Sequence, residues 1–425
     1  MTVEGLPARQ AALALLSGVL TRRKPLDAEL PLLKALPARD AAFARALASH
    51  TLRHLGALEA VLRKFLAKPL KPHKSGAAME ILLLGACELL VLQTPAHAAV
   101  DAANRLAASD EKAVHFKPLV NAVLRKIASD GPRVLSSLDR ERLSTPDWLY
   151  QRWTLQYGAS VARQIARAHQ AEAALDITLK HNGAAHPESN ALFGLSRRVT
   201  QSERVEELPG FAEGAWWVQD AAATLPAILL GDVTGKDVID LCAAPGGKTL
   251  QLAAAGGRVT AVEKQASRIA RITENLARTG LTATLAESDA RDFDGTAPLV
   301  LIDAPCTSTG TIRRHPELPW IKSAADVTQM AAQAYEILES GAAMVTPGGK
   351  LVFAVCSLER EEGEEQIAAF LDSHPEFARD PITADEVFGK KEWLTPEGEL
   401  RTLPFYLEGG MDGFFAARLR KSETA

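Results

Sequence analysis

The sequence predicts a multidomain protein in which an all-α domain is followed by a small α+β subdomain and then by an α/β domain with a doubly wound parallel sheet. Three observations lead to this prediction. The chain has 425 residues, well beyond the roughly 100 to 150 residues of a typical domain. Apolar residues recur every three or four positions up to about residue 128, which is the period of an amphipathic helix. From residue 238, short apolar strands alternate with helical segments, a pattern typical of parallel strands joined by crossover helices.

The first predicted domain, residues 1–130, is helical throughout. Few β-branched runs interrupt its apolar spacing, and Pro69, Pro72 and Pro95 lie in the breaks between helices. We expect the chain to turn at Ser129–Pro132, where this domain ends. The helices expected here cover residues 11–20, 43–62, 79–93, 98–107 and 116–127.

The α+β connector is predicted to cover residues 131–230. Ser144 and Thr145 precede Pro146, which suggests a helix N-cap followed by proline at the first helical position. A helix is expected at 148–168 and a strand at 175–180, with loops marked by glycine and proline after them.

The α/β domain is predicted to cover residues 231–425. In sheets of this type, ligands lie beyond the carboxyl ends of the strands. Helices are expected at 248–255, 267–279, 324–338 and 363–374. The expected strands cover residues 238–242, 258–262, 284–286, 299–303, 350–355 and 414–419.

The composition excludes several classes of protein. With 47% hydrophobic and 24% charged residues, the chain is not of the disordered or low-complexity class. No stretch approaches the ~18 uncharged residues of a membrane span, and residues 1–20 lack the compact apolar core of a signal peptide. The four cysteines include no CxxC pair, which argues against a disulfide scaffold and against zinc. We expect a cytoplasmic protein with reduced thiols, no metal and no membrane contact, and we take it to be a monomer.

The net charge of −4 conceals an asymmetry. Residues 1–130 hold 18 Lys and Arg against 11 Asp and Glu, a charge of +7, so the rest of the chain carries −11. Residues 1–130, the helical head, are therefore basic while the rest of the chain is acidic, which suggests a polyanionic partner for the head. The densest cluster of cations is Arg63, Lys64, Lys68, Lys71 and Lys74, and a plain solvated surface is the alternative interpretation.

A nucleoside cofactor is predicted at the ends of the first three strands of the α/β domain. The turn Asp240–Thr249 brings glycines to the start of a helix, which lets backbone approach a ligand. Neither GxxxxGK[ST] nor GxGxxG is present, which disfavours a nucleoside triphosphate and a nicotinamide dinucleotide. Glu263 ends the second strand, where an acid can take both ribose hydroxyls, and Asp289 follows the third strand on the adenine side. Together these features indicate a cofactor such as S-adenosylmethionine.

Two cysteines follow neighbouring strands at the same edge. Cys306 comes after the fourth strand and Cys356 after the fifth. If these two strands are neighbours, the two thiols should stand roughly one or two strand spacings of ~4.8 Å apart. The other two cysteines, Cys87 and Cys242, are interpreted as small buried hydrophobic residues.

A thiol beside a methyl donor suits methylation of carbon 5 of a cytosine. That carbon is a poor nucleophile until a thiolate adds to carbon 6 of the ring. Asp303 is placed to hydrogen-bond the ring nitrogen and the exocyclic amine as charge builds there. Lys248 and the adjacent helix N-terminus supply positive potential that can lower a thiol pKa. A second thiol could assist elimination afterwards.

These residues resemble the RNA cytosine carbon-5 methyltransferases of the Sun/Fmu (RsmB-like) family. The helical head, including Val120–Lys126, is similar to an antitermination-factor-like RNA-binding domain, so the resemblance covers nearly the whole chain. The matching stretches are Asp240–Thr249, Glu263–Asn275, Asp289, Asp303–Gly310, Arg313–Pro316, Val355–Ser357, Glu361–Glu364 and Asp412–Phe415.

The resemblance implies a class I, Rossmann-like methyltransferase domain and assigns roles that the spacing leaves open. Cys356 is implied as the nucleophile and Cys306 as the residue for product release, with Asp303 and Lys248 completing the catalytic set. RNA is the implied partner, with 16S rRNA or a pre-ribosomal particle as the expected substrate. The implied cofactor contacts for S-adenosylmethionine are Cys242, Ala243, Ala244, Pro245, Gly246, Gly247, Lys248, Glu263, Arg268, Asp289 and Asp303.

Two alternatives remain open from the residues alone. A non-catalytic RNA-binding factor would keep the fold but needs no thiols, whereas this chain has both. A DNA cytosine methyltransferase would use the cysteine of a Pro-Cys pair, which would make Cys306 the attacking residue. The acidic run Glu359–Glu365 is interpreted as acids at the N-terminus of the next helix.

Overall fold

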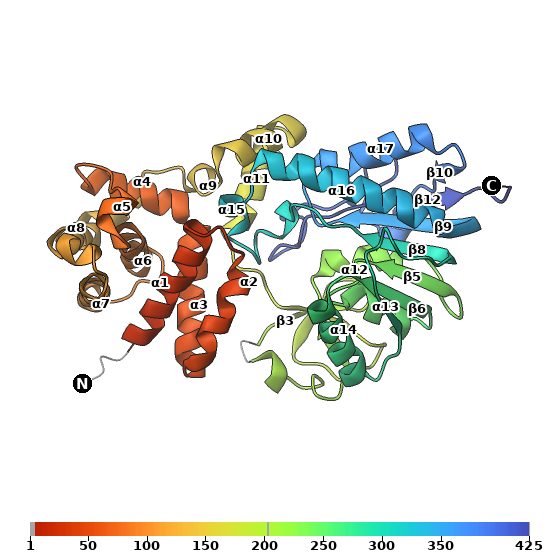
Figure 1. Cartoon of the computed structure of the whole chain (residues 1–425), viewed down its shortest axis with the longest axis horizontal. Coiled ribbons are helices and arrows are strands. Elements are labelled where there is room, and N and C mark those ends of the chain that lie inside the picture. Colours follow the sequence, from red (N-terminus) through yellow and green to blue (C-terminus); the bar gives the residue numbers. More distant parts are fainter. Residues whose placement is uncertain (1–4, 202–203, 425) are drawn as a thin grey trace. The chain divides into compact units, whose positions relative to one another are not determined.

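The protein is described by a computed structural model that covers residues 5–201 and 204–424. The chain folds into two units, each described by itself (Figure 1). The first unit holds residues 1–171 together with 312–323, and the second holds residues 172–311 together with 324–425. No helix among the described residues is both long enough and apolar enough to cross a bilayer.

The first unit is helical, as predicted, but the helix expected at 43–62 is two helices, α3 and α4, which meet at His54. The longer helices bury apolar side chains, for example Leu15 of α1, Leu47 of α3 and Ile81 of α6. Helix α1 packs on α3, and α6 packs on α8. Its helices are α1 (Leu6–Leu20), α2 (Leu26–Glu29), α3 (Ala38–Arg53), α4 (Leu55–Phe65), α5 (Pro72–Ser75), α6 (Ala78–Leu90), α7 (Ala96–Ser109), α8 (Lys117–Ser136), α9 (Arg140–Leu143), α10 (Asp147–Tyr157), α11 (Ala159–His169) and α15 (Leu318–Ile321), with 3-10 turns at Leu30–Ala35 and Ala113–Phe116.

The turn predicted at Ser129–Pro132 is wrong, because α8 continues through it. A Cβ at Gly131 would lie 2.9 Å from an atom of Ile127 and 3.0 Å from an atom of Leu90. This glycine therefore serves close side-chain packing rather than a turn. Pro132 costs the helix one backbone hydrogen bond, and the packing of the apolar face of α8 outweighs that loss.

The single helix predicted at 148–168 is two helices. Gly158 separates α10 from α11 with φ +83°, a conformation that favours glycine. Pro146 lies at the N-cap, one residue before α10 rather than inside it.

The second unit begins with a small antiparallel sheet in the order β2-β3-β1-β4, which confirms the strand predicted at 175–180. Ile177, Leu179 and Trp216 are buried on one face of it. Its strands are β1 (Asp176–Leu179), β2 (Ser189–Ala191), β3 (Ser196–Val199) and β4 (Trp216–Val218).

The larger sheet has the order β10-β12-β9-β8-β5-β6-β7, with β11 paired to β12. The pairs from β9 to β7 are parallel, as predicted, whereas β12 runs antiparallel to β9. β12 is followed by β10, which pairs antiparallel with it and forms the edge of the sheet. Its strands are β5 (Asp237–Leu241), β6 (Arg258–Glu263), β7 (Thr284–Glu287), β8 (Ala297–Asp303), β9 (Val345–Val355), β10 (Phe377–Arg379), β11 (Leu400–Arg401) and β12 (Phe415–Lys421).

Both faces of this sheet are covered by helices (Figure 1). Successive residues of a strand point to opposite faces, so Val300 and Ile302 of β8 pack with α16 and α17, whereas Leu299 and Leu301 pack with α12 and α13. Because the strands from β9 to β7 are parallel, their carboxyl ends lie at the same end of the sheet. The helices are α12 (Ala221–Ile228), α13 (Gly247–Ala254), α14 (Ala266–Thr279), α16 (Ala324–Ala343) and α17 (Glu364–Ser373), with 3-10 turns at Val205–Glu207, Thr309–Thr311, Arg360–Glu362, Asp385–Val387 and Lys391–Trp393.

Candidate active site

The predicted cofactor loop, Cys242–Lys248, joins β5 to α13 at the carboxyl edge of the sheet. Two of its residues have left-handed backbone, Cys242 with φ +60° and Gly246 with φ +103°. These turns return the chain so that α13 begins at Gly247. Backbone N–H groups in the first turn of a helix have no partner inside the helix, so this end suits an anionic group of a ligand.

A buried carboxylate supports the loop from behind. Asp240 of β5 is fully buried, and Thr249 Oγ1 of α13 donates a hydrogen bond to it at 2.6 Å. Burial raises the pKa of Asp240 to about 7. The bond ties the strand to the helix on either side of the loop.

Glu263 and Arg268 form the next wall of the site. Glu263 is 2% exposed at the end of β6 and accepts the backbone N–H of Gln265 at 3.1 Å. Arg268 lies 3.1 Å from the Glu263 carboxylate and also donates to the carbonyl oxygen of Ala244 at 2.8 Å. One guanidinium thus holds the acid and the loop together.

Asp289 stands two residues beyond β7, the neighbour of β6. Hydrogen bonds from Arg291 lower the pKa of Asp289 to about 2, and Lys264 Nζ lies 3.9 Å away. The predicted loop, Glu263 and Asp289 therefore follow three adjacent strands. A nucleoside with an amino-acid tail requires one carboxylate that accepts from the ribose hydroxyls, a second carboxylate beside the base, and helix N–H groups that bind the anionic tail.

An ion pair links the cofactor loop to the fourth strand end. Lys248 Nζ donates to Asp303 Oδ2 at 2.7 Å. The Lys248 residue is only 8% exposed to solvent. The same ammonium lies 5.2 Å from the centre of the Phe414 ring. The two predicted catalytic residues are thus in direct contact.

The two predicted thiols meet as expected. Asp303 of β8 pairs in register with Ala354 of β9, and beyond these residues Cys306 Sγ lies 3.5 Å from Cys356 Sγ. The hydrogen bond between the two thiols lowers the pKa of Cys356, while the same contact, together with burial, raises the pKa of Cys306 well above its usual value. The thiolate is therefore favoured on Cys356.

Ser308 is a residue of this site that the sequence analysis missed. Its Oγ lies 3.4 Å from Cys356 Sγ and 3.8 Å from Cys306 Sγ. Its backbone has φ +60°, a conformation uncommon outside glycine that is found at functional sites. Its place in a run of hydroxyl residues after Cys306 was the available signal.

Glu362 is the second residue missed. The acidic run does place Glu364 and Glu365 in the first turn of α17, as predicted. Glu362, however, is fully buried and accepts hydrogen bonds from Thr307 and Ser357. The interpretation of the whole run as helix-end acids is wrong for Glu362, which ends a 3-10 turn. It is also wrong for Glu359, which is fully buried and accepts a hydrogen bond from Thr309 Oγ1 at 3.3 Å.

Of the other two cysteines, Cys87 is buried as predicted, whereas Cys242 is only partly buried and packs against the hydrophobic core. Cys87 is fully buried in α6, and burial raises its pKa to about 12. Burial likewise raises the pKa of Cys242 to about 12. Across residues 5–201 and 204–424, no group of three or more His, Cys, Asp or Glu side chains is arranged to hold a metal ion.

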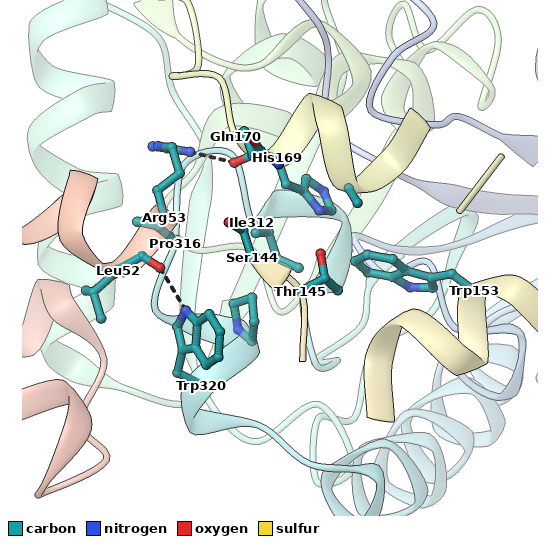
Figure 2. Close-up of a pocket in the computed structure, with 12 residues that line it drawn as sticks. Leu52, Arg53, Ser144, Thr145, Trp153, His169, Gln170, Ile312, Pro316 and Trp320 are labelled. Atoms are coloured by element: carbon teal, nitrogen blue, oxygen red, sulfur yellow. Dashed lines mark hydrogen bonds between the residues drawn. The ribbon is translucent and has the colours of Figure 1, made fainter. Parts of the chain in front are cut away.

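The chain that follows the Cys306 loop enters the helical unit as residues 312–323. Arg53 donates to the carbonyl oxygen of Arg313 at 3.0 Å. Figure 2 shows the small pocket at this point, where Trp320 Nε1 donates to the carbonyl oxygen of Leu52 at 2.9 Å. This segment is thus anchored among the helices of the first unit.

Comparison with known families gives two matches. Residues 227–420 match the family described as 16S rRNA methyltransferase RsmB/F. Residues 6–129 match the NusB family. The two matches fall on the α/β part and on the helical part of the chain.

Individual relatives agree with these matches. The chain is 34% identical over 431 residues to ribosomal RNA small subunit methyltransferase B of Sodalis glossinidius, covering 96% of each chain. It is 34% identical over 365 residues to the protein of the same name from Vibrio cholerae, covering 80% of this chain and 82% of the other. Among solved structures, PH0851 is similar with a TM-score of 0.77 and 24% identity, over 99% of this chain and all of the other, which supports the fold.

Proposed function

Because the chain belongs to the RsmB/F family of small-subunit rRNA methyltransferases and is an S-adenosylmethionine-dependent RNA methyltransferase, we propose that it methylates carbon 5 of a cytosine in 16S rRNA through a covalent cysteine adduct. The observation that carries this proposal is the pair of thiols 3.5 Å apart beside Asp303 and Lys248. A methyltransferase acting on a nucleophilic nitrogen or oxygen needs no such thiol, whereas carbon 5 of cytosine does.

Cys356 is the proposed nucleophile. Its lowered pKa places it closer to the thiolate form than Cys306, and the thiolate is the attacking species. In the first step its sulfur bonds to carbon 6 of the ring, and the electron pair of the carbon 5–carbon 6 double bond moves into the ring towards nitrogen 3. Carbon 5 thereby gains the electron density of an enamine.

Asp303 and Lys248 are proposed to stabilise this step. As a carboxylic acid, the Asp303 side chain would donate a hydrogen bond to the ring nitrogen, where negative charge develops, and would accept one from the exocyclic amine. Lys248, 2.7 Å from Asp303, offsets that charge in a site with little exposure to water. S-adenosylmethionine supplies an electrophilic methyl group to carbon 5 when it is bound.

Cys306 is proposed to release the product. Once the Cys356 sulfur is bonded to carbon, the thiolate that raises the pKa of Cys306 is gone, so Cys306 can lose its proton to solvent and act as a base. It then removes the proton from carbon 5, the bond between carbon 6 and the Cys356 sulfur breaks, and Cys356 leaves as a thiolate. The methylated cytosine regains its aromatic ring.

The cofactor contacts are part of the same proposal. The backbone of Cys242–Lys248 would hold the methionine portion at the start of α13, the Glu263 carboxylate would take the ribose hydroxyls, and Asp289 would lie on the adenine side. Arg268 supports the proposal by fixing both Glu263 and the loop at Ala244.

RNA binding is assigned to the helical part of the chain, residues 1–130, with residues 131–230 as connector and 231–425 as catalytic domain. Support comes from the exposed side chains of Lys64, Lys68, Lys71 and Lys74. A rRNA substrate places the enzyme in the cytoplasm, on free 16S rRNA or on an assembling small subunit.

Bisulfite sequencing of 16S rRNA tests the proposed function. In 16S rRNA from a strain that lacks this protein, bisulfite should convert one cytosine to uracil. When the protein is restored, the same cytosine should be methylated and resist conversion. The purified protein should then methylate that position in unmodified rRNA. A methyl group found on a nitrogen or on the ribose would contradict the proposal.

A further inference from the structure

The loops behind the two thiols are joined by one buried carboxylate. Glu362 Oε1 accepts the backbone N–H of Thr307 at 2.7 Å, and Glu362 Oε2 accepts the Thr307 hydroxyl at 2.6 Å. The hydroxyl of Ser357 donates to the same carboxylate. Thr307 directly follows Cys306 and Ser357 directly follows Cys356, so a single side chain fixes both positions adjacent to the thiols.

The contacts leave Glu362 little freedom. The residue is fully buried, as are Thr307 and Ser357. All three hydrogen bonds run towards the acid, which suits a carboxylate because it has only acceptor sites. An amide at this position would have to turn its NH₂ group towards a donor. Loss of the carboxylate should therefore loosen the two loops.

The surroundings of the two thiols differ in charge. The charge of Glu362 acts on Cys306, whose pKa is raised by the hydrogen bond to Cys356, by burial and then by this carboxylate. Cys356 instead has the Ser308 hydroxyl and the Lys248 ammonium nearby, which oppose the effects of burial and of Asp303 on its pKa. A protonated Cys306 can donate its hydrogen to Cys356.

We propose that Glu362 is a positioning residue that makes Cys356, rather than Cys306, the reactive thiol of the pair. It holds the two loops so that the sulfur atoms meet at 3.5 Å, and its negative charge keeps Cys306 as the hydrogen-bond donor. Which of the two cysteines attacks and which releases the product is thereby decided by an acid that is fully buried behind their loops. This inference rests on the proposed role of Cys356.

Competitive alkylation with iodoacetamide tests the inference without RNA or cofactor. The intact protein is labelled to a small extent at about pH 8, above the pKa of about 7 to which burial raises Glu362, and peptide mass spectrometry gives the ratio of Cys356 to Cys306 labelling. The ratio should strongly favour Cys356 in the unaltered protein. Glu362→Gln should lower it by about tenfold, the effect of one unit in the difference between the thiol pKa values.

The matched control is Glu365→Gln, which removes an exposed acid from the same run and should leave the ratio unchanged. An unchanged ratio in folded Glu362→Gln, or preferential labelling of Cys306 in the unaltered protein, would overturn the inference. If Glu362→Gln fails to fold, Thr307→Val decides, because it removes one of the three hydrogen bonds at constant shape. It should shift the ratio about two- to threefold in the same direction, and no shift would overturn the inference.

The outcome is separable from the proposed function. A protein that labels as expected but does not methylate cytosine would refute the function and leave the role of Glu362 intact. If the protein methylates cytosine but the Cys356-to-Cys306 labelling ratio is unchanged in the variants, the proposed function stands and the role of Glu362 is refuted.

Discussion

The two halves of the carboxyl edge, beyond β5 to β7 and beyond β8 and β9, are built in different ways. In the cofactor half, backbone turns and separate ion pairs hold each group, such as Arg268 with Glu263 and Arg291 with Asp289. In the thiol half, one buried network joins both loops through Glu362. Independent contacts respond to substitution in small, additive steps, whereas a coupled network fails as a whole.

The ion pair between Lys248 and Asp303 crosses from one half to the other. Substitutions in the thiol half should therefore abolish chemistry while leaving cofactor affinity intact. Substitutions in the cofactor half should weaken binding gradually. The following experiments can break or sharpen this contrast.

The largest effect is expected for Cys356→Ala. Without the attacking sulfur, methylation of rRNA should fall to background, while S-adenosylmethionine binding measured by calorimetry stays nearly unchanged. Cys87→Ala, which removes a buried cysteine of the helical unit, is the control and should keep activity. Sustained turnover by Cys356→Ala would contradict the assignment of the nucleophile.

Asp303→Asn should follow with a rate loss of about a hundredfold or more, in the range of removing a positioned acid–base group. Single-turnover kinetics of thiol addition at saturating S-adenosylmethionine measures it, because Asp303 is also an implied cofactor contact and saturation separates the two roles. Asp294→Asn, an exposed acid between β7 and β8, should be silent. Only a mild change in rate for Asp303→Asn would remove this residue from the ring nitrogen.

Much of the fold was predictable because its signals are local. The alternation of apolar strands and helices identified the order of elements from β5 to β9, since strands buried on both faces and helices of period 3.6 are written in adjacent residues. The turn predicted at Ser129–Pro132 was wrong, because Gly131 is required by the close approach of the Ile127 and Leu90 side chains and not by a turn. A glycine next to a proline in the sequence does not show which side chains pack against it.

The same limit applies to the site. Residues at strand ends, such as Glu263, Asp303 and both thiols, were found because topology brings the ends of neighbouring strands together. Glu362 was missed because five similar acids lie in seven residues, and only the folded structure shows that Glu359 and Glu362 are the two fully buried ones. Which thiol is more acidic depends on the hydrogen bonds and charges around each sulfur, so spacing alone left it open.

A moderate effect is expected for the cofactor acids. Glu263→Ala and Asp289→Ala should each weaken S-adenosylmethionine binding by ~1 to 3 kcal/mol, the range for removing hydrogen bonds to a ligand. Calorimetry on each single variant and on the double variant also tests additivity. Glu274→Ala on the exposed side of α14 should bind normally, and unchanged affinity in both acid variants would show that the cofactor lies elsewhere.

The smallest effect is expected from the basic cluster of the helical unit. Charge reversal of Lys64, Lys68, Lys71 and Lys74 should weaken RNA binding and flatten its salt dependence, by ~0.7 to 0.9 in the log-log slope for each phosphate that the protein no longer neutralises. S-adenosylmethionine affinity should not change. Charge reversal of Lys390 and Lys391, exposed in the second unit, should leave the slope alone; equal slopes in all three proteins would remove the cluster from the RNA-binding surface.

The central claim, that Cys356 bonds to the cytosine while Cys306 releases it, is tested most directly by the fate of Cys306→Ala. Incubated with rRNA and S-adenosylmethionine and then denatured, this variant should accumulate a protein–RNA adduct, because addition and methyl transfer proceed and elimination does not. Nuclease digestion and peptide mass spectrometry should place a methylated cytidine nucleotide on the sulfur of Cys356. Absence of any adduct in Cys306→Ala, or an adduct on Cys306 in the Cys356→Ala variant, would contradict the claim.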